Sequence, residues 1–413
     1  MGENNLLTLT KKLISIPSTY YHEDEIISYC ASYLEKNGLN VEVMEYQENI
    51  AIGYTGKNII SIIDTKKPGR TILLNGHLDT VPVCDGWKKN PFIPFEDNGR
   101  IYGLGAVDMK SGAAILIELF IYLNRLKDNL TGRVILSLVS DEEGPFGLGA
   151  NALIEEHKLP PIDLVISCEP SASFSNQNFP VLCLGARGCF VYNIDFLGKS
   201  AHASKPETGI NAAIEAAKFI VETENVKLKE DKVLGKGSFC VLKVISDGGA
   251  CSVPSLARVT IHRHIVSFED EEYVMNEAKD LIKKANVNVP YKISLRKEPS
   301  LGARYYKPYY VDKENSFVKE FINVIKEVNN NEVNLDYFSS IGDFNYFATR
   351  LFNKEKEHPI TLIFGPDGAN FHSANEYVKI DSIYKTYDTI LKYLLKILGE
   401  WIWMSGKILI EIE

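Results

Sequence analysis

The sequence contains few cysteines, and their spacing argues against two kinds of cysteine-based site. Seven cysteines are scattered over 413 residues, and no two of them form a Cys-x-x-Cys pair. An odd, scattered set fits neither a disulfide framework nor a paired-cysteine zinc site. We therefore expect free or buried thiols in a reducing compartment.

A basic block and a long apolar run are also missing. The net charge is −9, and no cluster of Lys and Arg could bind the phosphate backbone of a nucleic acid, so we expect no nucleic-acid partner. The most apolar helix candidate, residues 112–126, contains Glu118 and Asn124 and is too short to span a bilayer. The N-terminus, Met1–Leu6, shows no signal-peptide pattern. We therefore predict a cytoplasmic protein with no membrane association.

The composition is that of a soluble globular protein, with 45% hydrophobic and 24% charged residues, and the length predicts about two to three domains. Strand-like apolar runs alternate with segments of helix length outside the middle of the chain. This pattern is typical of an α/β fold, in which helices flank a mixed, largely parallel sheet. Strands are predicted at 71–75, 133–139, 164–167 and 359–364, and helices at 5–16, 22–37, 111–126, 150–157 and 313–328.

The pattern changes between residues 185 and 299. Apolar residues alternate with others around 190–196, as in a strand with one solvated face. A helix at 209–222, strands at 239–245 and 257–266, a helix at 269–284 and a strand at 291–295 follow. The order βαββαβ predicts a compact α+β unit of ferredoxin-like type. We therefore predict a catalytic domain formed by 1–184 and 300–413, with a second domain, 185–299, inserted into it.

Histidines and acidic residues follow the predicted strands. His77 and Asp79 lie two residues apart after the strand at 71–75, so their side chains point the same way. Asp79 can then hold one ring nitrogen of His77 while the other nitrogen faces a metal. Because the carboxyl ends of parallel strands meet at one edge, residues from other strand ends should join them. These are Asp141, Glu142, Glu143, Glu169 and His372, together with Asp108 from the loop before the helix at 111.

Two imidazoles with three or four carboxylates suit a pair of divalent ions. Zinc is the first choice, and manganese and cobalt are alternatives. Two ions about 3.5–4 Å apart need a bridging carboxylate. The adjacent Glu142 and Glu143 cannot both aim at one point, so we expect one to bind metal and the other to act as a general base toward water.

Five segments together resemble one protein family. They are Gly76-His-Leu-Asp-Thr-Val-Pro82, Gly105-Ala-Val-Asp-Met-Lys110, Asp141-Glu-Glu-Gly144, Cys168-Glu-Pro170 and His372. The family is that of the two-zinc amidohydrolases and peptidases, which include acetylornithine deacetylase, succinyl-diaminopimelate desuccinylase, aminoacylase and carboxypeptidase G. The resemblance extends from the first helix to about Leu398 and implies a zinc-exopeptidase-like catalytic domain. It also implies a cis peptide bond between Asp108 and Met109.

The resemblance implies a role for each residue of the cluster. His77 and Glu169 would hold one ion, Glu143 and His372 would hold the other, Asp108 would bridge them, Glu142 would be the base, and Asp79 would orient His77.

Residues 198–212 resemble the lid motif of this family. The matching histidine, His202, would reach across a dimer interface and polarise the scissile carbonyl oxygen. Asn211, in the same motif, would contact the substrate. The resemblance therefore implies a homodimer formed through the inserted lid domain.

The chain departs from the family in the lid. Relatives carry Asp-x-Arg where this chain has His262-Arg263-His264, and in relatives that arginine binds the free carboxylate of the substrate. His264 occupies the position, whereas Arg263 should point to the opposite face. Either His264 binds the carboxylate, or a local bulge turns Arg263 inward. The tail after Gly399 has no counterpart in the family, and its alternating end could form an edge strand.

We therefore expect a metal-dependent hydrolase that cleaves an amide bond next to a free carboxylate. The substrate would be an N-acyl amino acid or a short peptide. Within the family, glutamate at the position of Glu169 accompanies deacylases and carboxypeptidases, whereas aspartate accompanies dipeptidases and tripeptidases. A dipeptidase is one alternative. A catalytically silent relative that binds peptides is another, and it would need a broken set of metal ligands.

Overall fold

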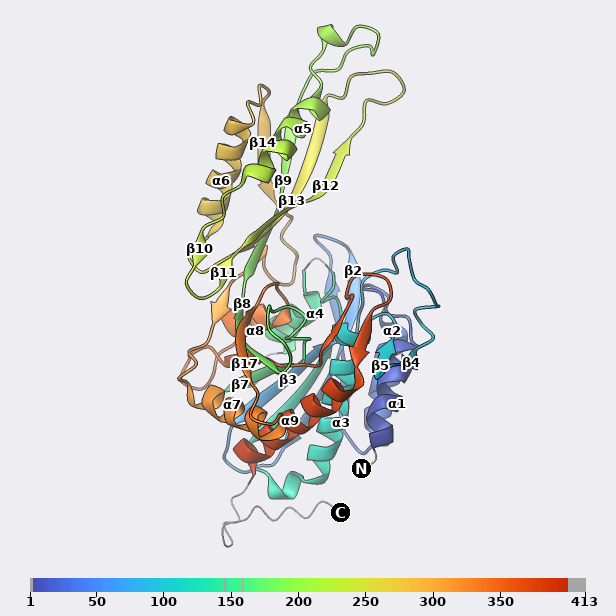
Figure 1. Cartoon of the computed structure of the whole chain (residues 1–413), viewed down its shortest axis with the longest axis vertical. Coiled ribbons are helices and arrows are strands. Elements are labelled where there is room, and N and C mark those ends of the chain that lie inside the picture. The colour runs from blue at the N-terminus through green and yellow to red at the C-terminus, as the bar shows by residue number, and fades with distance from the viewer. Residues whose placement is uncertain (1–2, 145, 158, 400–413) are drawn as a thin grey trace.

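The computed structural model describes residues 3–144, 146–157 and 159–399. It has two parts, a broad lower domain and a slender upper one (Figure 1). The upper part runs from β9 to β14, Gly188–Leu295, and we call it the inserted domain. The segment after Gly399, where the sequence suggests an edge strand, lies outside the described residues.

A nine-stranded mixed sheet forms the centre of the large domain. Its strands lie in the order β1-β2-β6-β3-β7-β18-β8-β16, and β17 pairs with β8. The central strands β6, β3, β7 and β18 are mutually parallel, whereas β2 and β8 run antiparallel to the neighbours in this order. The bounds are β1 Val41–Glu48, β2 Tyr54–Asp64, β3 Thr71–His77, β6 Arg133–Val139, β7 Leu164–Ser167, β8 Val181–Ala186, β16 Tyr309–Tyr310, β17 Asn334–Phe338 and β18 Ile360–Ile363.

Helices cover both faces of this sheet, as predicted. One face packs against α1, α2, α3, α7 and α9 in the largest apolar cluster, and the other packs against α4 and α8. Every residue of β3 is buried, which explains its continuous apolar run. The bounds are α1 Glu3–Ile14, α2 Asp24–Lys36, η1 Ala106–Lys110, α3 Ser111–Arg125, η2 Lys127–Asn129, α4 Leu148–Ala152, η3 Leu153–His157, α7 Ser316–Val328, α8 Asp343–Arg350 and α9 Ile380–Leu398.

The inserted domain is an antiparallel sheet with helices α5 and α6 on one face and a core of its own. The sheet order is β12-β13-β9-β14, and β15 of the large domain also pairs with β9. The predicted order βαββαβ is present, while the domain limits at 184/185 and 299/300 remain predictions. The bounds are β9 Gly188–Leu197, η4 Pro206–Thr208, α5 Ala212–Glu222, η5 Thr223–Asn225, β10 Glu230–Asp231, β11 Gly235–Lys236, β12 Ser238–Ser246, β13 Leu256–Ile265, α6 Glu271–Lys284, β14 Tyr291–Leu295 and β15 Tyr305–Tyr306.

A small four-stranded sheet joins two segments that are far apart in the sequence. Its order is β19-β20-β5-β4, and the bounds are β4 Phe95–Asp97, β5 Arg100–Tyr102, β19 Gly368–Ala369 and β20 Tyr377–Lys379. His372 lies in the turn between β19 and β20, so this sheet fixes the position of that histidine.

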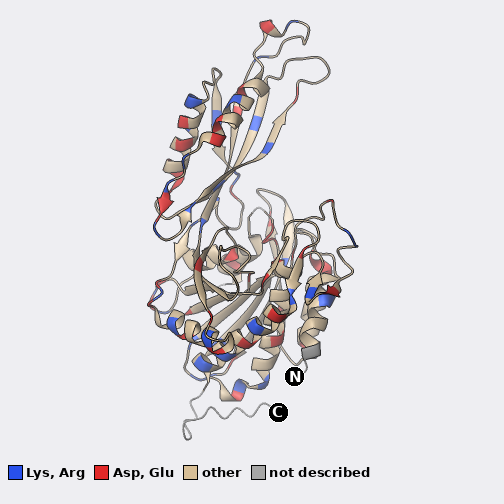
Figure 2. Ribbon diagram, viewed as in Figure 1, with Lys and Arg blue, Asp and Glu red and all other residues tan. Residues whose placement is uncertain are grey.

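The predicted elements agree with the observed ones to within three residues at nearly every end. The helix predicted at 150–157 is instead α4 followed by the π-helical turn η3. Helices α8 and α9 have no counterpart among the predicted elements. Acidic and basic residues are mixed along the outer helices of both domains (Figure 2). Among the described helices, none has both the length and the apolar character needed to cross a membrane.

The last residue of β1, Glu48, is a fully buried carboxylate that fixes two loops. It accepts hydrogen bonds from the backbone N–H groups of Ile50 and Ala51 (both 2.8 Å), Ile52 (2.7 Å) and Ser300 (2.9 Å). Burial opposes its ionisation, but these amides outweigh burial and lower the pKa of Glu48 from 4.5 to about 2.

We expect Glu48→Gln to lower the free energy of unfolding by about 3 kcal/mol at pH 6, because the ionised carboxylate is the preferred partner of these amides. The pKa of Glu48 is depressed in the folded state, so its contribution is complete above pH 4.5 and is lost as the pH falls toward 2. Denaturant unfolding at pH 6 and pH 3 measures this difference. The exposed Glu45 of the same strand is the control position. Equal destabilisation by Glu48→Gln at both pH values would contradict the prediction.

Candidate functional site

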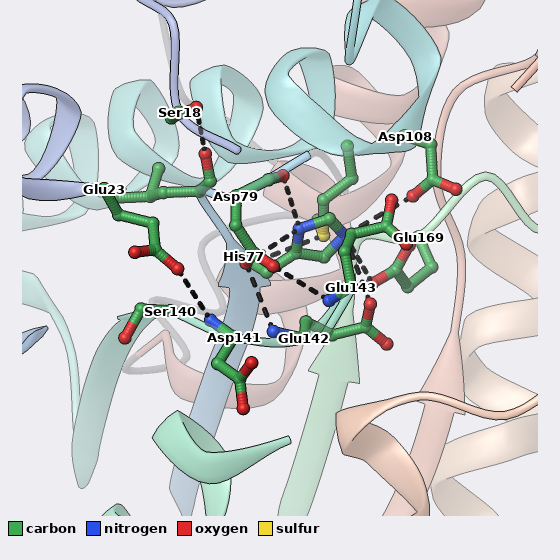
Figure 3. Close-up of polar contacts among 12 residues, drawn as sticks. Ser18, Glu23, His77, Asp79, Asp108, Ser140, Asp141, Glu142, Glu143 and Glu169 are labelled. Atoms are coloured by element: carbon green, nitrogen blue, oxygen red, sulfur yellow. Dashed lines mark hydrogen bonds and ion pairs between the residues drawn. The ribbon is translucent and has the colours of Figure 1, made fainter. Parts of the chain in front are cut away.

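Six of the predicted site residues lie together at one edge of the large sheet, where parallel strands end (Figure 3): His77, Asp79, Asp108, Glu142, Glu143 and Glu169. His77 is the last residue of β3, while Asp141–Glu143 and Glu169 follow the neighbouring strands β6 and β7. Asn75 of β3 pairs with Ser137 of β6 and with Ser167 of β7. The three strands therefore end within two residues of one another, which brings the residues after them together.

Asp108 lies between the two predicted metal-binding histidines. Nε2 of His77 is 3.4 Å from Oδ1 of Asp108 and 3.5 Å from Oε1 of Glu169. Nε2 of His372 is 2.8 Å from Oε2 of Glu143 and 3.6 Å from Oδ2 of Asp108. The structure thus groups the five predicted ligands as two halves that share Asp108, with one oxygen of Asp108 toward each histidine.

This cluster holds more negative than positive charge. Burial lowers the pKa of His372, but Glu143 and Asp108 outweigh burial and raise it to about 9. Burial likewise opposes protonation of His77, and Glu169 and Asp108 raise its pKa well above the ordinary range. The carboxylates around the two imidazoles therefore favour a positive charge at the centre of the cluster. Carboxylate oxygens and imidazole nitrogens are the donors that zinc and similar divalent ions prefer, so the residues fit a pair of such ions.

Asp79 orients His77 mainly through its main chain. Nδ1 of His77 lies 3.0 Å from the backbone oxygen of Asp79 and 3.5 Å from its Oδ1. The Asp79 carboxylate instead accepts hydrogen bonds from the backbone N–H groups of Glu142 (3.2 Å) and Glu143 (2.8 Å) (Figure 3). Asp79 thus also holds the loop that carries the predicted base and one predicted ligand.

The side chain of Glu142 faces the same cluster. Its Oε2 is 3.8 Å from Nε2 of His77. A methyl group at Gly342 would come within 2.9 Å of Oε1 of Glu142, so only glycine leaves this oxygen undisturbed. Burial raises the pKa of Glu142 well above the ordinary range, and Glu169 adds to this increase, whereas His77 opposes it. A carboxyl group with a raised pKa suits proton transfer near neutral pH.

Sequence reasoning missed the residue that holds the loop of Asp108. Glu376 is buried, and its Oε2 accepts a hydrogen bond from the backbone N–H of Gly105 (2.8 Å). Its Oε1 accepts from Val107 (2.9 Å) and Asp108 (3.1 Å). The peptide bond Asp108–Met109 is cis, which confirms the expectation from the family resemblance. Glu376 therefore ties the loop of Asp108 to the segment that follows His372.

We expect Glu376→Gln to weaken metal binding at the cluster about 10–100-fold, the usual effect of removing a residue that positions a ligand. Glutamine offers one acceptor oxygen where Glu376 uses two, so at least one backbone N–H loses its partner. A competition titration with a chelator measures the change. The control is Asp381→Asn, an exposed carboxylate at the start of α9. Unchanged affinity in Glu376→Gln would show that the loop needs no support from this side chain.

Two further buried carboxyl groups near the cluster were not predicted. Neither side-chain oxygen of Asp343, at the start of α8, has a hydrogen-bond partner within the described residues, and burial raises the pKa of Asp343 to about 8. Glu23 accepts hydrogen bonds from the backbone N–H of Asp141 (3.1 Å) and from the hydroxyl of Tyr54 (2.8 Å). Glu23 thus fixes the start of the loop that carries Glu142.

His202 and Asn211 lie away from this cluster. The segment between β9 and α5 that carries them is at the end of the inserted domain farthest from the large domain (Figure 1). Nδ1 of the exposed His202 accepts a hydrogen bond from the backbone N–H of Ser204 (3.1 Å), which places the ring proton on Nε2. Oδ1 of Asn211 accepts from the backbone N–H of Ala213 (2.9 Å) and caps α5.

The structure corrects the prediction that Arg263 binds substrate. Its guanidinium is fully buried, 2.6 Å from Oε1 of Glu269 and 2.8 Å from Oε1 of Glu277. The pairing of β13 with β9 is regular through this position, so no bulge turns Arg263 toward the site. His264 points to the opposite face, where Ser340 of the large domain lies 3.5 Å from its Nε2. The alternative that uses His264 therefore remains as a prediction.

Comparison with known proteins gives consistent matches over nearly the whole chain. The model of peptidase family M20/M25/M40 matches residues 73–396. The chain is 24% identical over 399 residues to succinyl-diaminopimelate desuccinylase of Rickettsia bellii (strain OSU 85-389), and the match covers 95% of this chain and 96% of that protein.

Solved structures with the same fold also cover nearly the whole chain. A tripeptidase from Staphylococcus aureus subsp. aureus mu50 superposes with a TM-score of 0.73 at 20% identity, covering 96% of this chain and 99% of the other. A dinuclear metal-binding peptidase of the M20 family from Bacillus subtilis gives a TM-score of 0.65 at 15% identity, covering 96% and 98%. At these identities the likeness shows the fold, and it confirms the predicted α/β class.

Proposed function

This chain belongs to peptidase family M20/M25/M40, as its motifs predicted, and on that premise we propose that it cleaves an amide bond next to a free carboxylate. Membership shows a metal-dependent hydrolase that acts on carbon–nitrogen bonds. The substrate class, an N-acyl amino acid or a short peptide, is our proposal. The observation that carries it is the cluster at the ends of β3, β6 and β7, where Asp108 lies between two histidines beside Glu142.

We assign His77 and Glu169 to one ion, Glu143 and His372 to the other, and Asp108 to both. When bound, such ions lower the pKa of a water molecule and polarise a carbonyl group. Zinc is the metal we propose, because imidazole and carboxylate donors suit it, with manganese or cobalt as alternatives. Metal analysis of protein purified without added metal tests this choice.

Glu142 is the proposed general base. Its carboxylate would take the proton from the attacking water and later return that proton to the leaving amine. Asp79 supports this role, because its carboxylate holds the backbone of both Glu142 and Glu143. Burial raises the pKa of Glu142, so its carboxylate holds more firmly the proton that it must carry from the water to the amine.

We propose that the enzyme works as a homodimer formed through the inserted domain. Strand β12 is at the edge of its sheet, and its Leu242 and Val244 are 60% and 52% exposed. Ile214 and Val221 of α5 are also exposed. An apolar open edge is a surface on which a second copy could pair. Such a dimer would allow His202 of one copy to reach the cluster of the other, with Asn211 near the same substrate.

His264 is the proposed partner of the substrate carboxylate. It occupies the position of the family's carboxylate-binding arginine, and its contact with Ser340 places it at the junction of the two domains. Because an imidazole carries less charge than a guanidinium, we expect a looser preference for the carboxylate. We also place the protein in the cytoplasm, which its seven free cysteines support.

A substrate panel tests the proposal. The metal-loaded protein would be offered N-acetyl and N-succinyl amino acids and dipeptides, each with its carboxylate free or converted to the amide. We expect the free-carboxylate members to be turned over faster than their amides, and equal turnover of the two would overturn the proposal. A dipeptidase would instead require a free amino group. Glu169 favours the deacylase or carboxypeptidase alternative.

A further inference from the structure

A second group of metal-binding side chains lies at the base of the inserted domain, outside the carboxylate cluster. Cys189 of β9 is directly opposite His264 of β13, and His262 is two residues from His264 on the same strand. Directly opposed residues of an antiparallel pair, and residues two apart in one strand, share a face of the sheet. The thiol and both imidazoles therefore lie on one face, opposite the face that presents Arg263 to Glu277 of α6.

The three side chains are close enough together to share one ion. Sγ of Cys189 is 3.3 Å from Nε2 of His262, and one ligand atom from each of the three residues lies within 4.8 Å of the others. In a tetrahedral zinc site, with zinc–sulfur bonds of about 2.3 Å and zinc–nitrogen bonds of about 2.1 Å, neighbouring ligand atoms are about 3.6 Å apart. The thiol also lies 3.5 Å from the backbone oxygen of its neighbour Phe190.

From this arrangement we propose that Cys189, His262 and His264 form a third metal site, for a thiophilic ion such as zinc, with a fourth position left for water. One thiolate and two imidazoles form a softer donor set than the carboxylates of the proposed catalytic site. Oγ of Ser238 lies 2.7 Å from Nδ1 of His264, a hydroxyl partner of the kind that orients metal-binding imidazoles. Cys189 is buried while both histidines are partly accessible, so an ion can enter from the histidine side.

The charges around the group determine its affinity for a metal ion relative to that of the proposed catalytic site. Metal binding must displace the proton of Cys189, and the nearby Arg296 and Arg263 favour the thiolate even though burial raises the pKa of Cys189 to about 12. Arg263 is already neutralised by Glu269 and Glu277. The positive charge of Arg296 also acts electrostatically on His262, and the same charge would repel a divalent ion. We therefore expect this site to fill after the two positions of the carboxylate cluster.

Occupation of this site would have a consequence for catalysis. His264 is also the residue proposed to bind the substrate carboxylate, so the ion and the substrate would compete for its imidazole. This consequence rests on the proposed function, whereas metal binding itself does not. Metal binding can be measured without turnover, so its failure is distinguishable from failure of the proposed function.

Cobalt titration of the metal-free, full-length protein tests the proposal. The ligands assigned to the carboxylate cluster are oxygen and nitrogen atoms, so the first two equivalents should give no thiolate-to-cobalt charge-transfer band. We expect a third equivalent to produce that band in the near ultraviolet. Cys189→Ser and His262→Gln should each abolish the band and the third equivalent while keeping the first two.

Cys168→Ser is the matched control. Cys168 is another buried thiol, directly before Glu169, and is the cysteine nearest in sequence to the carboxylate cluster. Its substitution should leave the band unchanged. The proposal is overturned if the wild-type protein gives no charge-transfer band, if either Cys189→Ser or His262→Gln retains it, or if Cys168→Ser loses it. The wild-type result stands even where a variant folds poorly.

Discussion

Glu142→Gln is expected to lower kcat about 10³-fold while the protein keeps both metal ions, since a general base contributes roughly 10²–10⁴-fold. Glutamine preserves the shape of the side chain but cannot accept the proton of the attacking water. Among the described residues, Glu142 approaches the proposed ligands at His77, and this 3.8 Å contact is longer than those that join the ligands to one another, so loss of the carboxylate should spare metal binding. Steady-state kinetics and metal analysis of the same preparation measure the two effects separately.

The control for this variant is Glu156→Gln, an exposed glutamate in η3. It should have wild-type kcat. A fall of less than tenfold in Glu142→Gln would remove the proposed role of Glu142. Loss of one metal ion together with activity would instead make Glu142 a ligand, and Glu143 would become the candidate base.

The strand ends could be predicted from the sequence because they depend on local patterns. The buried run of β3 and the residues that follow β6 and β7 are visible as apolar segments bounded by acidic residues. Parallel strands in one sheet end at a common edge, so His77, Glu142 and Glu169 had to meet. The two-residue spacing of His77 and Asp79 also predicted that their side chains lie on one side.

The detailed use of Asp79 could not be predicted from that spacing. Its carboxylate binds backbone N–H groups of Glu142 and Glu143, and these come from a different strand end. The same reason applies to Glu376 and Asp343, whose surroundings arise only when distant segments pack. A signal for Glu376 did exist, since a glutamate four residues after a predicted ligand, His372, is a candidate for support of the site.

The inserted domain likewise has features that could be predicted from the sequence and features that could not. Alternation along β13 correctly predicted that Arg263 and His264 face opposite ways. It did not predict which of the two side chains would be buried in the core of the inserted domain. Glu269 and Glu277 decide this, because they place two carboxylates against Arg263 within the domain's own core. Helix α9 was missed although its buried residues Ile383, Ile390 and Leu394 follow a helical period.

His202→Ala is expected to lower kcat by about 10²–10³-fold, the usual effect of removing one donor to a developing oxyanion. The backbone N–H of Ser204 binds Nδ1 of His202 and leaves the proton on Nε2, so the imidazole can donate to a carbonyl oxygen without first being protonated. His202 is exposed, and the segment that carries it is at the far end of the inserted domain (Figure 1), so its substitution should not disturb folding or metal content.

Mixing this variant with Glu142→Gln decides whether His202 acts within its own chain or in the partner. In a mixed dimer, the cluster of the His202→Ala chain keeps Glu142 and would receive His202 from the other subunit. Random exchange of subunits should therefore restore about a quarter of the wild-type activity, because half of the dimers are mixed and each has one complete site. If His202 serves its own chain, every site in the mixture lacks one group and activity stays at the level of the separate variants. Replacing the Glu142→Gln partner by a chain that carries both substitutions should abolish the recovery, which ties it to the second copy's histidine.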